Sequence, residues 1–220
     1  MTLTFVIPDI HGRYDLLNDG LAEITTRGDA GVIVTIGDYV DKGPESRQVV
    51  DRLLAGVEGF ELVPLKGNHD AMMIDALRDR SKMVDWLAKG GDTALASYGG
   101  DPANVPQSHI DWLDRLRLFH VDIHRLYVHA GVDSGIPLDL QREETLLWKR
   151  YSKGFSEGFG NLHVVHGHDN HPDGPLLYQG RTNLGTLAWR TGRLTIGIFD
   201  DDRPGGPIDF IVIMGAPAGR

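Results

Sequence analysis

One stretch, Thr35 to Ser46 (TIGDYVDKGPES), constrains the fold of this chain more than any other. The residues before its first glycine, 31–36, are apolar and mostly β-branched, which predicts a short buried strand. Gly43-Pro44 cannot continue a strand, and the residues after it are typical of a helix start. The carboxylates of Asp38 and Asp41 are therefore crowded at the strand's carboxyl end, the edge where α/β sheets bind ligands. Carboxylates this close repel one another unless a cation lies between them, which predicts a divalent metal site.

Two further strand-like segments end in the same way. Residues 3–7 lead into Pro8-Asp9-Ile10-His11-Gly12, and residues 61–65 lead into Lys66-Gly67-Asn68-His69-Asp70. A single polar tip after a strand is weak evidence, because it usually serves as a cap or a turn. Three such tips in succession are strong evidence, because the carboxyl ends of neighbouring parallel strands meet at one edge. We therefore expect Asp, His and Asn side chains to converge there.

The segments between these tips, residues 13–26 and 46–55, have helical periodicity. Strand, helix, strand, helix, strand is the order expected for parallel pairing with right-handed crossovers, so the fold class is α/β.

The middle of the chain is predicted to be helical and the second half to be rich in strands. Residues 70–87 are expected to form one helix and residues 108–116 a short helix capped by Ser108, which together give a helical layer at about 70–118. The extended segments expected after this layer are 119–123, 125–129, 162–166, 176–178, 194–199 and 208–213.

The composition excludes several classes of protein. There is no cysteine, so disulfides and thiolate metal sites are excluded. The formal charge is −9 and no run of basic residues occurs, which argues against binding of duplex nucleic acid. Before Pro8 the chain carries only the strand-like run Leu3–Ile7, which does not fit a signal peptide or a membrane span. We therefore expect one cytoplasmic domain over residues 1–220 that contacts no membrane.

The three tips resemble the signature motifs of the calcineurin-like metallophosphoesterases. The resemblance is closest to the phosphoprotein phosphatase branch, which includes bacterial Ser/Thr protein phosphatases and symmetric diadenosine tetraphosphate hydrolases. It covers nearly the whole chain through further motifs: Trp86 with Gly90-Gly91-Asp92-Thr93, Val128-His129-Ala130-Gly131, Leu147-Trp148-x-Arg150 and Val165-His166-Gly167-His168. The fold that this resemblance implies is α/β, with two packed mixed β-sheets flanked by helices.

The resemblance also implies a pair of metal ions. Carried over residue by residue, it assigns one ion to Asp9, His11 and Asp38, and the other ion to Asp38, Asn68, His129 and His168. Asp38 would bridge the two ions, since a carboxylate has two oxygens and a charge that offsets the repulsion between cations. Manganese, iron and zinc all accept imidazole and carboxylate ligands, and we expect manganese first.

The remaining polar residues would then carry the reaction. Members of the family hydrolyse phosphoesters by direct attack of a hydroxide that bridges the two ions. His69 would be the general acid that protonates the leaving alkoxide, with Asp41 orienting it. Lys42 and Arg150 would bind the phosphoryl oxygens.

Several residues depart from the family pattern. Pro8 stands where a glycine is usual, and Lys42 stands where the protein phosphatases typically have arginine. The change to lysine replaces a bidentate fork by a point charge. Gly185 and Leu187 replace the family's aspartate and glycine in the segment NLGTLA. None of these positions is an expected metal ligand, so the departures bear on the choice of substrate.

We expect a Ser/Thr protein phosphatase whose partner is a phosphoprotein or a phosphorylated small molecule. A first alternative is a hydrolase of dinucleoside polyphosphates or a decapping-type pyrophosphatase, which Lys42 favours, whereas Asp41 favours the protein phosphatases. A more distant alternative is a non-catalytic binding module on the same scaffold, which the complete set of ligands argues against. The sequence leaves open the physiological substrate, the metal in vivo, the oligomeric state and the roles of His166 and His171.

Overall fold

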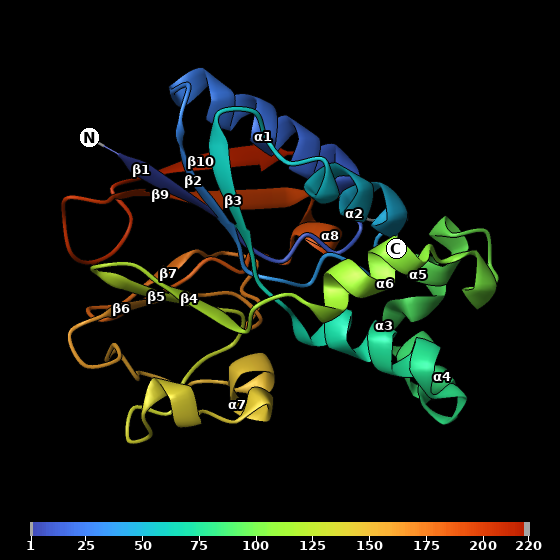
Figure 1. Ribbon diagram of the computed structural model, residues 1–220. Coiled ribbons are helices and arrows are strands. Elements are labelled where there is room, and N and C mark those ends of the chain that lie inside the picture. Colours follow the sequence, from blue (N-terminus) through green and yellow to red (C-terminus); the bar gives the residue numbers. More distant parts are fainter. Residues whose placement is uncertain (1, 218–220) are drawn as a thin grey trace.

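Ten strands pair into two five-stranded sheets within residues 2–217, the part of the chain that the computed structural model describes (Figure 1). The strands of the first sheet, in chain order, are β1 (Leu3–Ile7), β2 (Gly31–Thr35), β3 (Phe60–Pro64), β9 (Arg193–Asp200) and β10 (Asp209–Met214). Those of the second are β4 (Phe119–Val121), β5 (Arg125–Val128), β6 (His163–His166), β7 (Leu176–Leu177) and β8 (Arg181–Asn183).

The first sheet has the strand order β10-β9-β1-β2-β3. β1, β2 and β3 run parallel, with Phe5 opposite Ile33 and Ile33 opposite Leu62, and the helices α1 (Tyr14–Arg27) and α2 (Ser46–Leu54) connect them. The predicted alternation of parallel strands and helices is thus confirmed. Because the three strands are parallel, their carboxyl ends meet at one edge, and the three polar tips meet with them.

The second sheet has the order β4-β5-β6-β8-β7, in which β5, β6 and β8 are parallel while β4 and β7 are antiparallel to their neighbours. The first sheet also mixes both kinds of pairing, since β9 runs antiparallel to β1 and β10. The expected architecture of two mixed sheets flanked by helices is confirmed.

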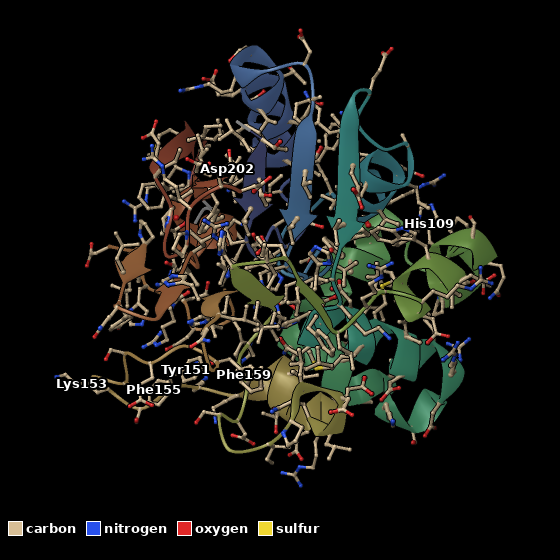
Figure 2. All side chains as sticks on the ribbon, turned by 60° about the vertical axis from the view of Figure 1, so that its left-hand side comes forward. His109, Tyr151, Lys153, Phe155, Phe159 and Asp202 are labelled. Atoms are coloured by element: carbon tan, nitrogen blue, oxygen red, sulfur yellow. The ribbon has the colours of Figure 1, made fainter. Side chains whose placement is uncertain are left out.

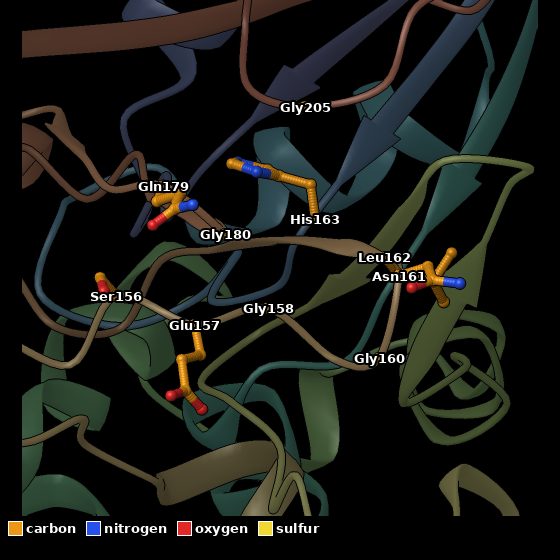
Figure 3. Close-up of a pocket in the computed structure, with 10 residues that line it drawn as sticks. All are labelled: Ser156, Glu157, Gly158, Gly160, Asn161, Leu162, His163, Gln179, Gly180 and Gly205. Atoms are coloured by element: carbon orange, nitrogen blue, oxygen red, sulfur yellow. The ribbon is translucent and has the colours of Figure 1, made fainter.

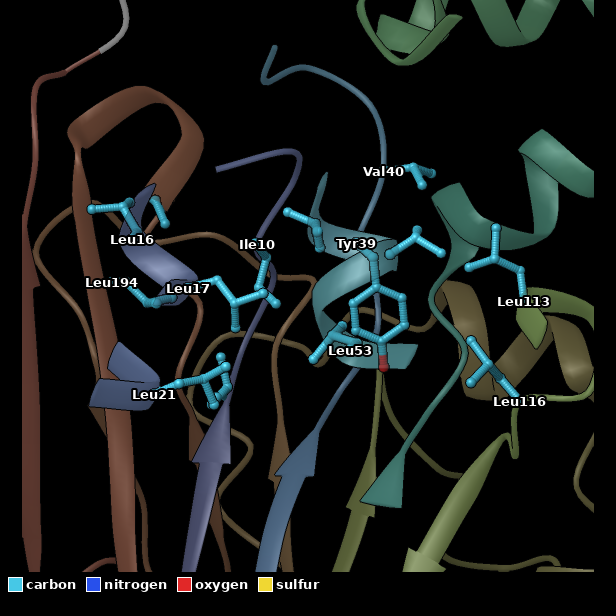
Figure 4. Close-up of a cluster of buried hydrophobic side chains, with 14 of the residues drawn as sticks. Ile10, Leu16, Leu17, Leu21, Tyr39, Val40, Leu53, Leu113, Leu116 and Leu194 are labelled. Carbon is cyan, nitrogen blue, oxygen red and sulfur yellow. The ribbon is translucent and has the colours of Figure 1, made fainter. Parts of the chain in front are cut away.

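Alternation along the strands divides the apolar side chains among three layers. Val6 of β1 faces the second sheet, where it joins a buried cluster that includes Tyr127 and Val165. Its neighbours Phe5 and Ile7 face the opposite way and pack with α1 and α2. Figure 4 shows this outer layer, with Leu16, Leu17 and Leu21 of α1 against the sheet. A third cluster covers the outer face of the second sheet and includes Leu146 of α7 (Glu143–Trp148).

The helices between β3 and β4 lie side by side at the right of Figure 1. They are α3 (Asn68–Arg78), α4 (Met83–Trp86), α5 (Asp92–Ser97) and α6 (Gln107–Asp114), and a last short helix, α8 (Ala188–Thr191), precedes β9. The four helices α3 to α6 occupy the segment expected for the helical layer at about 70–118. The single domain over residues 1–220 stays a prediction, and residues 1 and 218–220 lie outside the described part.

Two helix predictions were wrong in detail. Residues 70–87 do not form one helix, because α3 ends at Arg78 and a 3₁₀ turn, Arg80–Lys82, separates it from α4. The short helix after it begins at Gln107 behind Pro106, and Ser108 makes no capping hydrogen bond. Proline can serve there because it presets the backbone without needing a side-chain acceptor.

The loop after α7 is anchored by aromatic side chains. Figure 2 shows Tyr151, Phe155 and Phe159 near one another in this loop, whereas His109 lies in the helical layer on the other side of the molecule. The rings of Tyr151 and Phe155 are stacked at 5.0 Å, and the Tyr151 hydroxyl accepts a hydrogen bond from the backbone N–H of Val132. The loop therefore packs against the chain that follows β5.

Within residues 2–217, no helix has both the length and the apolar content that crossing a bilayer requires.

Candidate metal centre

The six residues expected to bind metal are buried and meet where the two sheets come together at their carboxyl edges. The first sheet contributes the tips after its three parallel strands, and the second sheet contributes the residues that follow β5 and β6. The tips supply Asp9, His11, Asp38 and Asn68, and the second sheet supplies His129 and His168.

Two groups of potential ligands share the carboxylate of Asp38. One consists of His11, Asp38 and His69, the other of Asp38, His129 and His168, and in each group the ligand atoms lie within 4.8 Å of one another. Asp38 Oδ2 is 3.2 Å from His11 Nε2, and Asp38 Oδ1 is 3.6 Å from His129 Nε2. The two oxygens of one carboxylate thus face two different histidines, which is the arrangement needed for a bridge between two cations.

Hydrogen bonds to the backbone orient two of these imidazoles. His11 Nδ1 lies 2.8 Å from the carbonyl of Val40, and His129 Nδ1 lies 2.8 Å from the carbonyl of Ile36. A carbonyl can only accept, so Nδ1 donates in both rings and Nε2 is left as the lone pair that faces Asp38. Metal-binding histidines are commonly oriented through their other ring nitrogen in this way, so the donor set fits divalent cations.

Asn68 and Asp9 complete the surroundings of the second group. Asn68 Oδ1 is 2.8 Å from His129 Nε2 and 3.1 Å from His168 Nδ1. The carboxylate of Asp9 accepts the backbone N–H of His168 at 3.2 Å. The first group therefore contains His69 where the resemblance implies Asp9, although Asp9 remains beside the centre. The role of each residue as a ligand stays a prediction.

The tips, and the loop that carries His168, have strained backbone. His11, Asp38, Asp41, Lys42 and His168 all have φ between 46° and 72°, the left-handed region that costs a non-glycine residue about 1–2 kcal/mol. Strain of this kind persists where the surrounding structure enforces it, and it clusters at functional sites. Its concentration at the tips indicates that side-chain placement is maintained against the local preference of the chain.

The electrostatics favour an ionised carboxylate at Asp38. Burial alone would raise the pKa of Asp38, but the neighbouring imidazoles, His129 first, hold that pKa well below its usual value. Burial lowers the pKa of His168 to about 4. Metal ligands must be deprotonated, so Asp38 and His168 are already in the state that binds a cation.

His69, a member of the first group, forms a hydrogen-bonded pair with Asp41. His69 Nδ1 is 2.7 Å from Asp41 Oδ2, and the His69 ring packs edge-on against His11 with the ring centres 4.8 Å apart. Burial lowers the pKa of His69 to about 2, against the opposing effect of Asp38, and burial also raises the pKa of Asp41 well above its usual value. Burial therefore disfavours a separated ion pair and leaves one proton shared on this hydrogen bond.

Comparison with known proteins identifies the family to which this fold belongs. A family model described as calcineurin-like phosphoesterase matches residues 3–199, a range that includes the whole second sheet, most of the first sheet and every residue of the two groups. The chain belongs to the calcineurin-like phosphoesterases.

Relatives of this phosphoesterase carry two kinds of name. "Serine/threonine-protein phosphatase 2" of Escherichia coli is 40% identical over 88 residues, which cover 40% of this chain and 38% of that protein. "Serine/threonine-protein phosphatase 1" of Salmonella typhimurium is 34% identical over 154 residues, which cover 66% and 68%. A symmetrical bis(5'-nucleosyl)-tetraphosphatase of Pseudomonas fluorescens is 28% identical over 131 residues, which cover 59% and 43%. The chain therefore spans less than half of the first and third of these relatives, but 68% of the second.

A solved metallophosphoesterase from Sphaerobacter thermophilus has the same fold. It superposes with a TM-score of 0.59 at 17% identity, and the match covers 96% of this chain and 88% of that chain.

The two cations expected to bind phosphate lie on different sides of the phosphoesterase's metal centre. Lys42 Nζ is 2.9 Å from His11 Nε2, so it donates to the lone pair that faces the first group. Arg150 Nη1 donates to Asp169 at 2.8 Å, next to His168, and its side chain is 62% exposed. The structure thus places each of them near one of the two groups.

The histidines whose roles the sequence left open lie outside both groups. His166 is buried, and its Nε2 is 3.0 Å from Arg181 Nη1. Burial, aided by Arg181, lowers the pKa of His166 to about 3. The His171 side chain is half exposed, 3.6 Å from Asp169. Neither residue belongs to a potential metal group of residues 2–217.

A cavity of about 350 Å³ lies at the start of β6, at the opposite end of this strand from the candidate metal centre (Figure 3). It is lined by His163, the first residue of β6, and by Gln179 and Gly205, whereas the metal centre lies beyond the last residue of that strand. The cavity is therefore separate from the candidate metal centre.

Two residues with clear contacts to the centre were missed by sequence reasoning. The buried carboxylate of Asp70 accepts the backbone N–H groups of Asp38, Tyr39 and Gly67. The indole of Trp86 donates to the carboxylate of Asp41. The signal for Asp70 was its place in the third tip, directly after His69, and the signal for Trp86 was its place in a motif of the family.

Proposed function

We propose that this phosphoesterase is a Ser/Thr protein phosphatase that uses two divalent metal ions. The observation that carries the proposal is the shared carboxylate of Asp38, whose two oxygens face two histidine groups. The hydrogen-bonded pair of His69 and Asp41 lies directly beside it. A bridged cation pair next to a proton donor is the arrangement needed to hydrolyse a phosphomonoester.

Asp9, His11 and Asp38 would hold one ion, and Asp38 would share the other with Asn68, His129 and His168. When bound, the ions supply Lewis-acid polarisation of the phosphoryl group and of the attacking water. The donors are imidazole, carboxylate and amide oxygen with no sulfur, a set that manganese accepts, as do iron and zinc. Manganese is our first expectation.

The chain's own residues bind the substrate and move the proton. Lys42 neutralises one phosphoryl oxygen, and Arg150 turns from Asp169 to grip the phosphoryl group with its planar fork. His69 donates the proton of its Nε2 to the leaving oxygen of serine or threonine, while Asp41 keeps Nδ1 bound. The name of the relative with 68% of its length aligned, a Ser/Thr protein phosphatase, agrees with a phosphoprotein substrate. A cytoplasmic location stays a prediction.

The second candidate is hydrolysis of dinucleoside polyphosphates. It is supported by relatives named for that activity and by Lys42, a point charge where the protein phosphatases have a fork. A polyphosphate offers further oxygens away from the metals, so it depends less on bidentate grip. Decapping-type pyrophosphate cleavage belongs to the same alternative.

Turnover in parallel on a phosphothreonine peptide and on diadenosine tetraphosphate tests the proposal. The protein is purified, loaded with manganese and compared with the matched variant Asp38→Asn, which should be inactive on both. We expect the peptide to have the higher kcat/KM. Turnover of the dinucleotide alone would establish the alternative, and no turnover of either substrate would favour a non-catalytic binding module.

A further inference from the structure

The segment from Trp86 to Thr93 lies against the tip that carries Asp41 and Lys42, although none of its residues is proposed to bind metal or substrate. We infer that Trp86 is a positioning residue that fixes the carboxylate of Asp41 and, through it, the imidazole of His69. The inference rests on the proposed role of His69 as general acid.

The indole of Trp86 contacts both oxygens of one carboxylate. Its Nε1 lies 2.9 Å from Asp41 Oδ1 and 3.1 Å from Asp41 Oδ2, and Oδ2 is also the partner of His69 Nδ1 at 2.7 Å. Trp86 is 1% exposed and belongs to the main apolar cluster, so the donor has a fixed position. A carboxylate bonded on both oxygens cannot rotate freely, and its orientation sets the direction of the His69 ring.

The turn that follows Trp86 is shaped to fit this tip. Leu87–Gly91 forms a kink between α4 and α5 in which Gly90 adopts φ 105°, and the carbonyl of Gly90 accepts the backbone N–H of Lys42 at 3.0 Å. A Cβ on Gly90 would lie 2.9 Å from the Lys42 side chain. This kink brings the helical layer into contact with the tip that carries Asp41 and Lys42.

Gly91 makes room for the indole itself. A Cβ on Gly91 would lie 2.4–2.6 Å from three atoms of the Trp86 ring, closer than real contacts allow. The backbone of Gly91 has φ −67°, which alanine adopts without strain. The variant Gly91→Ala therefore displaces the indole while leaving its N–H donor and the local backbone intact.

The consequence for the reaction is a fixed proton donor. With Nδ1 of His69 held by Asp41, the proton on Nε2 points to one place, where the leaving oxygen must lie. Loss of the Trp86 contact leaves Asp41 and His69 present but free to reorient. The resulting loss should be confined to substrates whose leaving group needs a proton.

The test compares kcat of wild type and Trp86→Phe on two substrates. General acid catalysis contributes about 10²–10⁴-fold, and a misdirected acid should lose part of it, so we expect a loss of about tenfold or more on a phosphothreonine peptide. On p-nitrophenyl phosphate, whose leaving group tolerates negative charge, the loss should be less than about threefold by the same reasoning, with KM little changed. Gly91→Ala should show the same split between substrates.

Two controls separate positioning from general damage. Tyr98→Phe removes another buried hydrogen bond of the helical layer, to His109, without touching the pair, and should affect both substrates equally or not at all. In the background of His69→Asn, Trp86→Phe should cause no further loss on the peptide, because residues that act as one unit are not additive. Equal losses on both substrates, or an additive double variant, would overturn the inference.

A readout without substrate keeps the inference separate from the proposed function. The proton on His69 Nδ1, bound to Asp41 at 2.7 Å, should give a low-field NMR resonance in the ¹⁵N-histidine-labelled protein. Trp86→Phe and Gly91→Ala should shift or broaden it, and Tyr98→Phe should not. An unchanged resonance in both variants refutes the positioning role even in a protein that hydrolyses the peptide. Inactive wild type with the expected NMR changes refutes only the proposed function.

Discussion

The half of the metal centre that comes from the first sheet is held together by hydrogen bonds among its own loops. In the half from the second sheet, the histidines are oriented by residues of the first half. In the first half, the backbone N–H groups of Ile10 and His11 both donate to the carbonyl of Asp38, at 3.1 and 2.8 Å. The buried carboxylate of Asp70 then ties the second tip to the third. Hydrogen bonds among the three loops, from their backbones and from the side chain of Asp70, therefore hold these loops together.

The second half has one comparable bond of its own, from the backbone N–H of Gly167 to the carbonyl of His129 at 2.9 Å, but its ligands also rely on the first half. His129 is oriented through the carbonyl of Ile36, and the backbone of His168 donates to Asp9, so both depend on residues of the first sheet. The difference teaches that the first half sets the geometry of the whole centre. Changes in the first half should disturb both potential metal groups, and changes in the second half should disturb one.

Asp38→Asn tests this asymmetry with the largest expected effect. The variant keeps the size of the side chain but removes the charge that faces both groups, so both ions should be lost. Disturbing a partner of a metal ligand costs about 10–100-fold in activity, and removal of the shared carboxylate should exceed that. Elemental analysis of the folded variant measures the metal, and full occupancy would rule out a bridging role.

His168→Asn is the matched change in the second half. It should lower the metal content by about one ion of the two proposed, because only the second group contains this residue. Loss of both ions in this variant would show that the two halves are mutually dependent and that the asymmetry is wrong.

Asp70→Asn tests the bracing itself. An amide has one acceptor oxygen where the carboxylate has two, so at least one of the three backbone donors bound by Asp70 should lose its partner. An unsatisfied buried donor costs about 1–3 kcal/mol of unfolding free energy, and metal affinity should fall about 10–100-fold. Denaturant unfolding and metal titration measure the two effects. The exposed Asp79→Asn, which removes a carboxylate bonded to Ser81, is the control and should change neither.

The sequence predicted the strands and tips of the first half better than those of the second. It also predicted which residues form the centre better than it predicted their contacts. The three tips could be recognised in the sequence because each follows a β-branched or apolar run that stops at a glycine or proline. β8, Arg181–Asn183, was not expected, because three polar residues carry no strand pattern although all three are buried. Arg181 is buried there because aromatic rings of Tyr151 and Tyr178 flank its guanidinium, at 4.7 and 3.7 Å.

The helical layer shows a second limit. The periodicity of residues 70–87 was correct, but it did not reveal that the helix is interrupted after Arg78 or that the chain kinks at Gly90 to reach Lys42. Such interruptions are set by what the turn touches, here Asp41 and Lys42, which lie more than forty residues earlier in the chain. Local pattern does not contain that contact. For the same reason, the sequence indicated that Asp70 belongs to a helix but not that its carboxylate binds the backbone of the second tip.

The two cations offer a smaller comparison between the halves. Arg150, beside the second group, should matter more than Lys42, beside the first, because a bidentate charge-assisted contact is lost where no other fork can replace it. A charged hydrogen bond contributes about 1.5–3 kcal/mol, so Arg150→Ala should raise KM about tenfold or more, and Lys42→Ala should raise it less. Lys42→Arg should match or improve turnover of the phosphopeptide. A gain confined to diadenosine tetraphosphate would instead favour the alternative substrate.

The smallest expected effect concerns pH and the second sheet. His163 is buried at the start of β6, and burial, aided by the charge of Arg125, lowers its pKa to about 4. In the unfolded chain the same ring would take up a proton near its usual pKa of 6.5. Between these two values the unfolded state binds the extra proton, so stability should fall as the pH falls from about 6.5 towards about 4.

His163→Gln should reduce that slope, because the unfolded chain then has one proton fewer to gain. A difference of one bound proton between the unfolded and folded states gives a slope of about 1.4 kcal/mol per pH unit. Because solvent partly screens the ring, we expect the variant to lower the slope by about 1 kcal/mol per pH unit or less. Denaturant unfolding at several pH values measures it. His171→Gln, at a half-exposed histidine of the same half, is the control and should leave the slope unchanged. If His163→Gln also left it unchanged, acid sensitivity would arise elsewhere, and the second sheet would not be the half that yields first on acidification.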